Sequence, residues 1–275
     1  GPTGPSGLTR VACDGGPTGP SGLTRVACDG GPTCHRLVLA LFVSCVLVLC
    51  WCCSAAPAED ALPRLKVPAC DDFDVTGRGD HEAWKKAEWV TLQPRPNAKH
   101  DYQSRFKMLY SSRGVYVLFD GVDQRLTATK TEDFADLWKE DVFECFFWTH
   151  EDHPVYFEYE ISPLGRELPI LVPNLNGRFL GWRPWNYDGP RKIKKQVHSR
   201  GGAESMAKTT GWSAEVHIPY ALLEPLANVP PKPGTQWRAN FYRVDYDDDR
   251  VTGWDWARVG PSFHDYRRFG VLIFE

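Results

Sequence analysis

The chain has 275 residues and a formal net charge of −3, with 32 lysines and arginines against 35 aspartates and glutamates. Nucleic-acid binding needs a basic face that neutralises phosphates, and this balance offers none, so nucleic acid is excluded as a partner. Seven of the nine cysteines precede Ala58. The rest of the chain therefore carries neither a disulfide framework nor a zinc cluster.

The first 33 residues form a duplicated leader of low complexity. Residues 1–15 recur without change as residues 16–30, cysteine included. Structural repeats diverge in sequence and need at least three copies to bury a core, so an unchanged pair of copies does not indicate a repeat fold. We therefore expect residues 1–33 to lie outside the folded domain.

Residues 34–58 have the pattern of a secretory signal peptide. The basic pair His35-Arg36 precedes an unbroken apolar run over 37–53, and Ala58 ends a small-residue cleavage motif. This pattern predicts cleavage near Ala58 and an exported protein, extracellular or periplasmic. The alternative is a retained signal anchor, because an apolar run of this length reaches the lower limit for a membrane span. Only that alternative would place the chain at a membrane. Residues 59–69 are interpreted as a linker.

Short strands dominate the elements predicted after the linker. Alternating apolar and polar positions predict strands over 106–110, 115–119, 142–148, 155–161, 168–172, 212–218, 237–245 and 269–274, and helical patterns cover 80–88 and 219–226. Many short strands, Gly/Pro-rich connections and little helix are typical of a β-sandwich or jelly roll. We therefore predict an all-β, jelly-roll or immunoglobulin-like sandwich with short peripheral helices, forming one domain over 70–275.

Two of these strands divide into a core face and an acidic face. Successive side chains of a strand point to opposite sides of the sheet. The core face carries Phe143, Cys145 and Phe147, and the opposite face carries Glu144, Glu158 and Glu160. Two interpretations of the acidic face stay open. It is either a solvated surface of the sheet, or a set of carboxylates that meets a ligand beside aromatic loops.

Two connections concentrate tryptophan in irregular sequence. The segment GWRPWNYDG holds Trp182 and Trp185, and the segment GWDWARVG holds Trp254 and Trp256. Each indole carries a large apolar surface that a loop does not bury by itself. These side chains either cover the sandwich core or stay exposed to stack on a ligand. A sugar suits the second role, because its C–H faces pack on indole while its hydroxyls bond to carboxylates, amides and arginine.

The chain closely resembles the family 9 carbohydrate-binding modules and their stand-alone relatives in seven segments that occur in order. The segments are FDVTGRGDHEAWKKAEWVTL, GVYVLFDGVDQRLTA, LWKEDVFECFF, YFEYEISPLG, GWSAEVHIPYALL, WRANFYRVD and SFHDYRRFGVLIF, and the match spans Cys70 to Glu275. The resemblance implies a jelly-roll sandwich of the DOMON-like type. It also implies an oligo- or polysaccharide ligand and a role in polysaccharide breakdown, with an extracellular glycoside hydrolase as partner.

The resemblance further implies a site in which two tryptophans sandwich a sugar ring. The W-x-x-D-x-x-E motif of the family falls on Trp138, Asp141 and Glu144, and the second tryptophan falls by spacing on Trp256. The chain departs from the family at Glu160, where sugar-binding modules tend to carry arginine. Hydrogen bonds are expected from the carboxylates, with Arg243 as a charge partner at the edge. The candidate ligand-binding residues are Trp138, Asp141, Glu144, Glu158, Glu160, Trp182, Trp185, Arg243, Trp254 and Trp256.

Two other activities compete with plain binding. A glycoside hydrolase needs two carboxyl groups across the scissile bond, and Glu144, Glu158 and Glu160 on adjacent strands offer them. DOMON-like folds also carry haem, which would need histidine or methionine ligands such as Met108. The resemblance is to binding modules, and sugar hydroxyls alone account for the carboxylates, so a non-catalytic binding module is preferred and no catalytic residue is assigned.

No cofactor is expected, with structural calcium as the alternative. Some members of the family bind calcium, and Asp245, Asp247 and Asp249 could supply oxygen ligands, but the glycine and glutamate of an EF-hand do not follow them. A solvated acidic turn is the preferred interpretation. Cys70 and Cys145 are the cysteines left after the leader, and export permits a bridge between them. The sequence does not show whether they are close enough.

Overall fold

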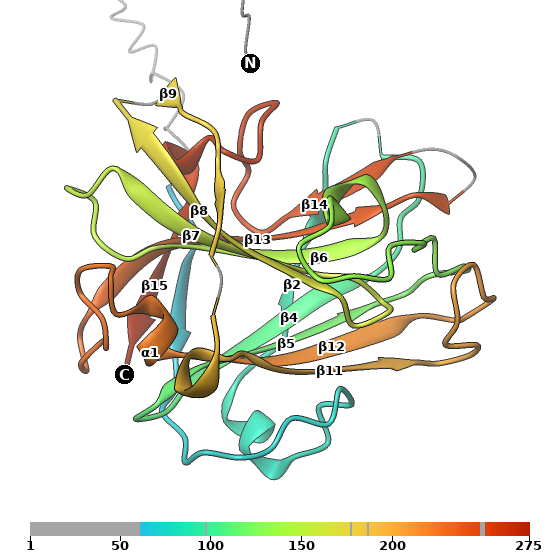
Figure 1. Ribbon diagram of the computed structural model, residues 1–275, viewed down its shortest axis with the longest axis horizontal. Helices are drawn as coiled ribbons and strands as arrows, with labels where there is room; N and C mark the ends of the chain where they lie inside the picture. Colours follow the sequence, from blue (N-terminus) through green and yellow to red (C-terminus); the bar gives the residue numbers. More distant parts are fainter. Residues whose placement is uncertain (1–60, 97, 177, 186, 248–250) are drawn as a thin grey trace, which may run out of the picture. The chain divides into compact units, whose positions relative to one another are not determined.

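The computed structural model describes residues 61–275 except 97, 177, 186 and 248–250 (Figure 1). The duplicated leader, the signal peptide and the cleavage site near Ala58 lie outside these residues. None of the helices in the described part of the chain has the length and apolar character needed to cross a membrane.

The first sheet contains the strands that carry the predicted acidic face. Its hydrogen-bonded order is β1 (Arg64–Val67), β15 (Gly270–Phe274), β13 (Gln236–Asp245), β6 (Val142–Trp148), β7 (Val155–Ile161), β8 (Glu167–Leu175) and β10 (Arg183–Pro184). Short strands extend its edges: β14 (Thr252–Asp255) pairs with β13, β3 (Gln93–Pro94) with β14, and β9 (Arg178–Phe179) with β8.

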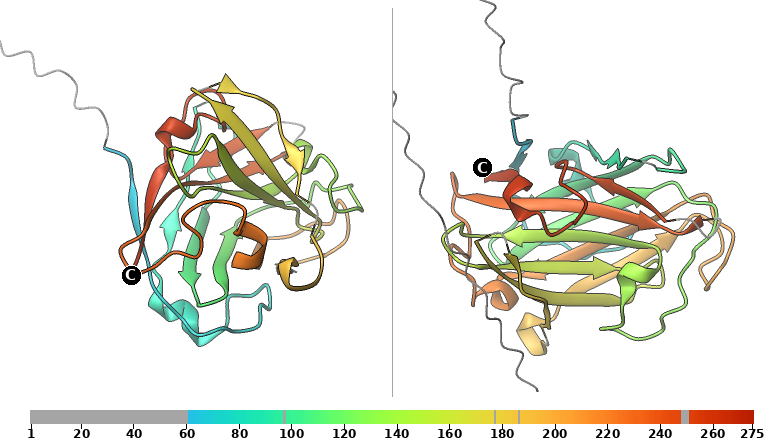
Figure 2. Two further views of the ribbon diagram at one scale, coloured as in Figure 1. Left: turned by 60° about the vertical axis from the view of Figure 1, so that its left-hand side comes forward. Right: turned by 90° about the horizontal axis from the view of Figure 1, so that it is seen from above.

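The second sheet packs beneath the first and closes the sandwich. Its order is β11 (Lys194–Ser199), β12 (Trp212–Pro219), β5 (Gly114–Gly121), β4 (Ser104–Tyr110) and β2 (Val90–Thr91). Figure 1 shows the two layers one above the other, and Figure 2 shows them from two further directions. The helix α1 (Tyr220–Leu223) and short 3₁₀ turns lie at the periphery. The predicted all-β sandwich is confirmed.

Aromatic side chains from both sheets fill the space between the layers. Phe143 of β6 stacks on Phe119 of β5 with ring centroids 4.9 Å apart, and Phe106 of β4 stacks on Phe241 of β13 at 3.8 Å. Cys145 and Phe147 lie fully buried in the same cluster. Stacked aromatic pairs bury large apolar areas, and this burial stabilises the packing of the two sheets. The core face predicted for β6 is confirmed.

The opposite face of the first sheet is also covered. Val142, Phe146 and Tyr156 belong to a second buried cluster, together with side chains such as Val259 and Phe269 from the connections after β14. The acidic face is therefore not an open surface of the sheet, because segments folded over it leave Glu144, Glu158 and Glu160 buried. This cover is what turns a sheet face into a site.

The predicted linker is wrong for its central part. Residues 64–67 form β1, which pairs in parallel with β15, and Val67 is fully buried in the sandwich core. The sequence RLKV is short and half charged, so its alternation was too brief to indicate a strand. Pairing with the C-terminal strand supplies the hydrogen bonds that local sequence does not specify.

The disulfide between Cys70 and Cys145 is absent, and both are free thiols in the described chain. Cys145 points into the core between the sheets, whereas Cys70 packs against a third cluster on the outer face of the second sheet. The second sheet thus lies between the two sulfur atoms. Burial raises the pKa of the Cys70 thiol to about 11, which keeps it protonated and weakly reactive.

Candidate functional site

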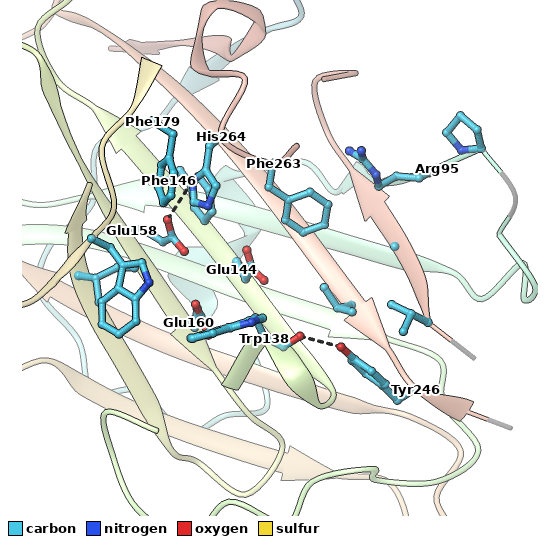
Figure 3. A pocket seen from close by; sticks show the side chains of 16 residues that line it. Arg95, Trp138, Glu144, Phe146, Glu158, Glu160, Phe179, Tyr246, Phe263 and His264 are labelled. Atoms are coloured by element: carbon cyan, nitrogen blue, oxygen red, sulfur yellow. Dashed lines mark hydrogen bonds and ion pairs between the residues drawn. The ribbon is translucent and has the colours of Figure 1, made fainter. Parts of the chain in front are cut away.

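A cavity of about 580 Å³ lies on the covered outer face of the first sheet. Its floor is formed by β6 and β7, and its walls come from the connections before β6, after β8 and after β14 (Figure 3). A volume of this size is typical of small-molecule sites. The lining residues are Arg95, Pro96, Trp138, Glu144, Phe146, Glu158, Glu160, Ile170, Phe179, Trp182, Val244, Tyr246, Val251, Gly253, Phe263 and His264.

Three carboxyl groups form the floor of the cavity. Glu144 of β6 is paired in register with Glu160 of β7, and Glu158 lies two residues earlier on the same face. Directly opposite residues of an antiparallel pair have Cβ atoms about 5 Å apart, so the carboxyl groups crowd together. The side chains of Glu144, Glu158 and Glu160 are only 2%, 4% and 1% exposed. The sequence-predicted acidic trio is therefore brought together.

Burial sets the protonation of this floor. Desolvation raises the pKa of Glu144 to about 8. It raises the pKa of Glu158 and of Glu160 well above the usual range, and the neighbouring carboxylates add to the effect. A side-chain hydrogen bond joins Glu158 to Glu160, but within the part of the chain that the structure describes the Oε2 atom of each has no hydrogen-bond partner. The floor thus holds protons at neutral pH and keeps unused hydrogen-bonding capacity.

His264 closes one end of the floor without supplying a positive charge. Its Nδ1 atom lies 3.7 Å from Glu158 Oε2 and 2.6 Å from the hydroxyl of Tyr156. The ring stacks on Phe179 with centroids 4.5 Å apart. Desolvation lowers the pKa of His264 to about 4, so the imidazole is neutral at physiological pH. The contact with Glu158 is therefore a polar contact and not a charged pair.

The walls of the cavity are aromatic. Trp138 and Trp182 meet edge to face, with ring centroids 5.9 Å apart and planes at 74°. The carbonyl of Trp138 accepts a hydrogen bond of 2.9 Å from the Tyr246 hydroxyl. In the view of Figure 3, Glu144 lies between Trp138 and Phe263. Phe263 is held in place by stacking on Tyr242 at 4.2 Å, so the cavity has rigid apolar surfaces around a polar floor.

Asp141 positions a wall and does not line the cavity. Its side chain is fully buried and accepts hydrogen bonds from the backbone N–H groups of Thr127, at 2.6 Å, and Tyr246, at 2.8 Å. Because Tyr246 in turn bonds to Trp138, this carboxyl ties the two aromatic residues to one place. The motif that the resemblance supplied thus divides into two lining residues, Trp138 and Glu144, and one positioning residue.

Four other predicted site residues lie away from the cavity. Trp254 is fully buried in the sandwich core, and Trp256 packs edge to face on Phe106 and Phe241 with its ring against Gly270. Trp185 donates a hydrogen bond of 3.0 Å to the carbonyl of Leu222 and covers the core from its edge. The fourth residue is Arg243, which lies between the sheets.

Arg243 compensates a buried acidic cluster. Its Nη2 atom lies 2.6 Å from Asp245 and 3.1 Å from Asp123, and all three side chains are fully buried. Asp123 and Asp245 also come within 4.8 Å of an oxygen of Asp247. The guanidinium already supplies the positive charge that calcium would bring to these carboxylates. Of the predicted calcium ligands, Asp249 lies outside the described residues.

Several cavity residues were not predicted from the sequence. Tyr246, Phe263 and His264 come from connections and Phe179 from the two-residue strand β9, so periodicity gives no face to assign to any of them. The sequence signal for such residues is an aromatic side chain in a polar, irregular segment. The candidate ligand-binding residues include the tryptophans of such segments but not their phenylalanines, tyrosines or histidines. Arg95 was missed because its contacts are distant in sequence: it lies 4.8 Å from the Phe263 ring centre and pairs with Asp255 at 2.8 Å.

Sequence comparison finds one matching protein family and one related protein. Residues 75–166, which include β6 and β7, match the family described as Carbohydrate family 9 binding domain-like. A protein from Arthroderma benhamiae that is named "Extracellular protein" is 28% identical over 191 residues, covering 65% of this chain and 82% of the relative.

Solved structures share the same sandwich. A Bacteroides uniformis protein proposed to bind carbohydrate superimposes with a TM-score of 0.66 at 18% identity, covering 78% of this chain and 100% of that protein. A family 9 carbohydrate-binding module of Caldicellulosiruptor kristjanssonii, solved with cellotriose, gives a TM-score of 0.54 at 16% identity over 77% of this chain and 93% of the module. The same module has been solved with glucose. These likenesses establish the fold.

Proposed function

We propose that this protein, a Carbohydrate family 9 binding domain-like protein by sequence and fold, is an exported carbohydrate-binding protein that supports polysaccharide breakdown. The observation that carries the proposal is an aromatic-walled cavity over a floor of carboxyl groups. Its partners are an oligo- or polysaccharide and a glycoside hydrolase that acts on the same polymer. The family match and the sugar-bound module of the same fold support the carbohydrate ligand.

Sugar chemistry matches the two kinds of surface in the cavity. The C–H faces of a pyranose ring are apolar and pack on Trp138 and Trp182, where burial of the ring and the indoles gains free energy in proportion to area. The ring hydroxyls both donate and accept hydrogen bonds. They therefore suit the carboxyl groups of Glu158 and Glu160, whose Oε2 atoms have no hydrogen-bond partner among the described residues.

Export rests on two independent observations. Residues 34–58 have the pattern of a signal peptide, and the Arthroderma benhamiae relative is named as extracellular. A secreted binding protein contacts polysaccharide outside the cell. A partner hydrolase would act on the polysaccharide in the same place.

The binding proposal is tested by two tryptophan substitutions in the full chain, measured by calorimetry with cellotriose and by a glycan panel. Trp138→Ala removes a lining indole, and we expect an affinity loss of roughly 1.5–3 kcal/mol, tenfold or more, in a variant that stays folded at the assay temperature. Trp256→Ala removes a side chain that packs on the core, and we expect a lower unfolding temperature with binding retained.

Two results would contradict this assignment. Unchanged affinity in Trp138→Ala would remove the cavity as the site. Loss of binding in Trp256→Ala at a temperature where the variant is folded would favour the position implied by the family motif. Release of reducing sugar ends in the same incubations checks hydrolysis, for which Glu144 has the raised pKa of a general acid. Release that disappears in Glu144→Gln would replace binding with catalysis.

A further inference from the structure

The floor of the cavity carries more acid than a neutral sugar requires. Glu144, Glu158 and Glu160 lie together on adjacent strands, and two of their oxygen atoms have no hydrogen-bond partner in residues 61–275 as the structure describes them. A buried carboxyl group is costly unless a positive charge or enough hydrogen bonds compensate it. All three glutamates line the cavity, so a ligand held there lies next to their side chains and can supply the missing partner.

The positive groups around the cavity are already engaged among the described residues. Arg95 pairs with Asp255 and donates a second hydrogen bond to the carbonyl of Gly260. Lys139 pairs with Asp136 at 2.6 Å and lies over the Trp138 ring, 5.3 Å from its centre. Neither of these side chains contacts the three glutamates in the described structure.

The other titratable groups that face the floor are neutral. Desolvation lowers the pKa of His264 to about 4 and raises the pKa of Tyr156 above its ordinary value. Burial likewise raises the pKa of Tyr246. These groups can exchange hydrogen bonds with the floor, but they cannot balance a carboxylate charge at neutral pH.

A protonated amine fits this environment better than a hydroxyl does. An ammonium group has three N–H donors and one positive charge, and the floor presents three carboxyl groups. Hydrogen bonds between charged partners are roughly twice as strong as those between neutral ones. Aromatic faces also attract cations, and Trp138, Trp182 and Phe263 stand around the same space.

We propose that the cavity selects a sugar that carries a protonated amine, as in the hexosamine units of a deacetylated polysaccharide, with the amine directed at Glu144, Glu158 and Glu160. This selectivity rests on the proposed function, because it names the class of sugar that the same site prefers. Glu160 stands where the resemblance implies an arginine, so under this proposal it is the residue that sets the charge preference. Arginine would repel an ammonium, whereas Glu160 attracts it.

Three trimers that differ at one ring position test the proposal on the full chain. They are β-1,4-linked glucosamine trimer, its N-acetylated counterpart and cellotriose, measured by calorimetry at pH 6.5. We expect the glucosamine trimer to bind roughly tenfold or more tightly than either neutral trimer, the difference made by a charge-assisted hydrogen bond. Its affinity should fall with added salt, and the affinities of the neutral trimers should not.

Binding of the amine should also release protons. The carboxyl groups of the free floor hold protons, and a bound cation favours their ionised form, so protons pass to the buffer. Calorimetry in two buffers of different ionisation enthalpy should show release on the order of one proton per trimer for glucosamine. If binding of the glucosamine trimer takes up protons, or releases none, the result contradicts the proposal.

Isosteric substitutions separate this proposal from the binding proposal. Glu160→Gln keeps the shape of the side chain and should cut the preference for the glucosamine trimer over cellotriose roughly tenfold, because it removes a carboxyl group but keeps hydrogen-bonding atoms in the same place. Glu82→Gln removes an exposed acid on the opposite side of the sandwich and should leave the preference unchanged. If cellotriose binds as tightly as the amine, the amine selectivity fails and sugar binding stands. If none of the trimers and no glycan on the panel binds, both proposals fail.

Discussion

A single residue type, glutamate on an apolar strand, marks the site more sharply than tryptophan does. Alternation separated Glu144 from Phe143 and Cys145, and the structure confirms that division. Tryptophan gives a weaker signal, because its large apolar surface is buried as readily in a sandwich core as against a ligand. Trp138 and Trp182 line the cavity, whereas Trp254 lies in the core. Spacing alone does not distinguish these outcomes, since each depends on which segment folds over which sheet face.

Arg243 offers a test of buried charge at the residue scale. Replacing it with methionine leaves Asp123 and Asp245 buried without a counter-charge, and we expect a loss of roughly 3–5 kcal/mol in the free energy of unfolding. Gly121 packs directly against the guanidinium, because a Cβ atom at that position would lie only 2.7 Å from Arg243 Nη1. Urea denaturation of Arg243→Met measures the loss.

The matched control for that substitution is Arg113→Met. Arg113 pairs with Asp72 at 2.5 Å, but its side chain is 67% exposed, so water screens the pair. We expect a much smaller change in the denaturation midpoint. Equal losses in the two variants would mean that the Arg243 cluster contributes no more than a surface pair.

At the scale of elements, central strands were predicted well and edge strands poorly. The strands β6 (142–148) and β7 (155–161) have the predicted bounds, because buried strands carry long uninterrupted alternation. By contrast, β11 reads KKQVHS and lies half-exposed at a sheet edge, and β14 was interpreted as loop. An edge strand buries one side at most, so its sequence keeps little of the pattern that identifies strands.

Strand β1 is the edge element with the clearest energetic consequence. Val67 is fully buried in the core, and Val67→Ala should lower the free energy of unfolding by about 2 kcal/mol through lost burial and a residual cavity. Lys66→Ala, one residue away, removes an exposed side chain and should change the midpoint little. The denaturation midpoints of the two variants are compared. Equal midpoints would mean that residues 64–67 contribute no more to stability than a linker does.

At the scale of the whole molecule, the sandwich could be predicted and its cover could not. Apolar alternation specifies which strand face is inward, and the Phe119 and Phe143 pair lies where that pattern puts it. The second buried cluster depends on connections, such as the segment that carries Phe263 and His264, whose paths are set by contacts between residues distant in sequence. The cavity forms because these connections cross the acidic face. Sequence composition can therefore suggest the class of ligand, but it does not specify the shape of the site.

The buried floor should make the stability of the whole protein depend on pH. The pKa of Glu144 is about 8 in the folded chain against 4.5 when unfolded. A group whose folded pKa is raised binds its proton more tightly in the folded state. Its stabilising contribution is therefore complete below about pH 4.5 and is lost as the pH rises toward 8. The loss per group is at most about 1.4 kcal/mol for each pH unit.

We expect the pH dependence that Glu144 causes to show in urea denaturation. The wild type and Glu144→Gln are compared from about pH 5 to about pH 8.5. Glutamine cannot ionise, so the variant should show the flatter profile and should become the more stable protein at the alkaline end. The difference between the two curves matters, because other acids contribute equally to both. Parallel curves would mean that water or a neighbouring group already stabilises the Glu144 carboxylate in the free protein. A protonated amine would then gain less from binding there, so the same measurement bears on the stability of the empty cavity and on its preference for a cation.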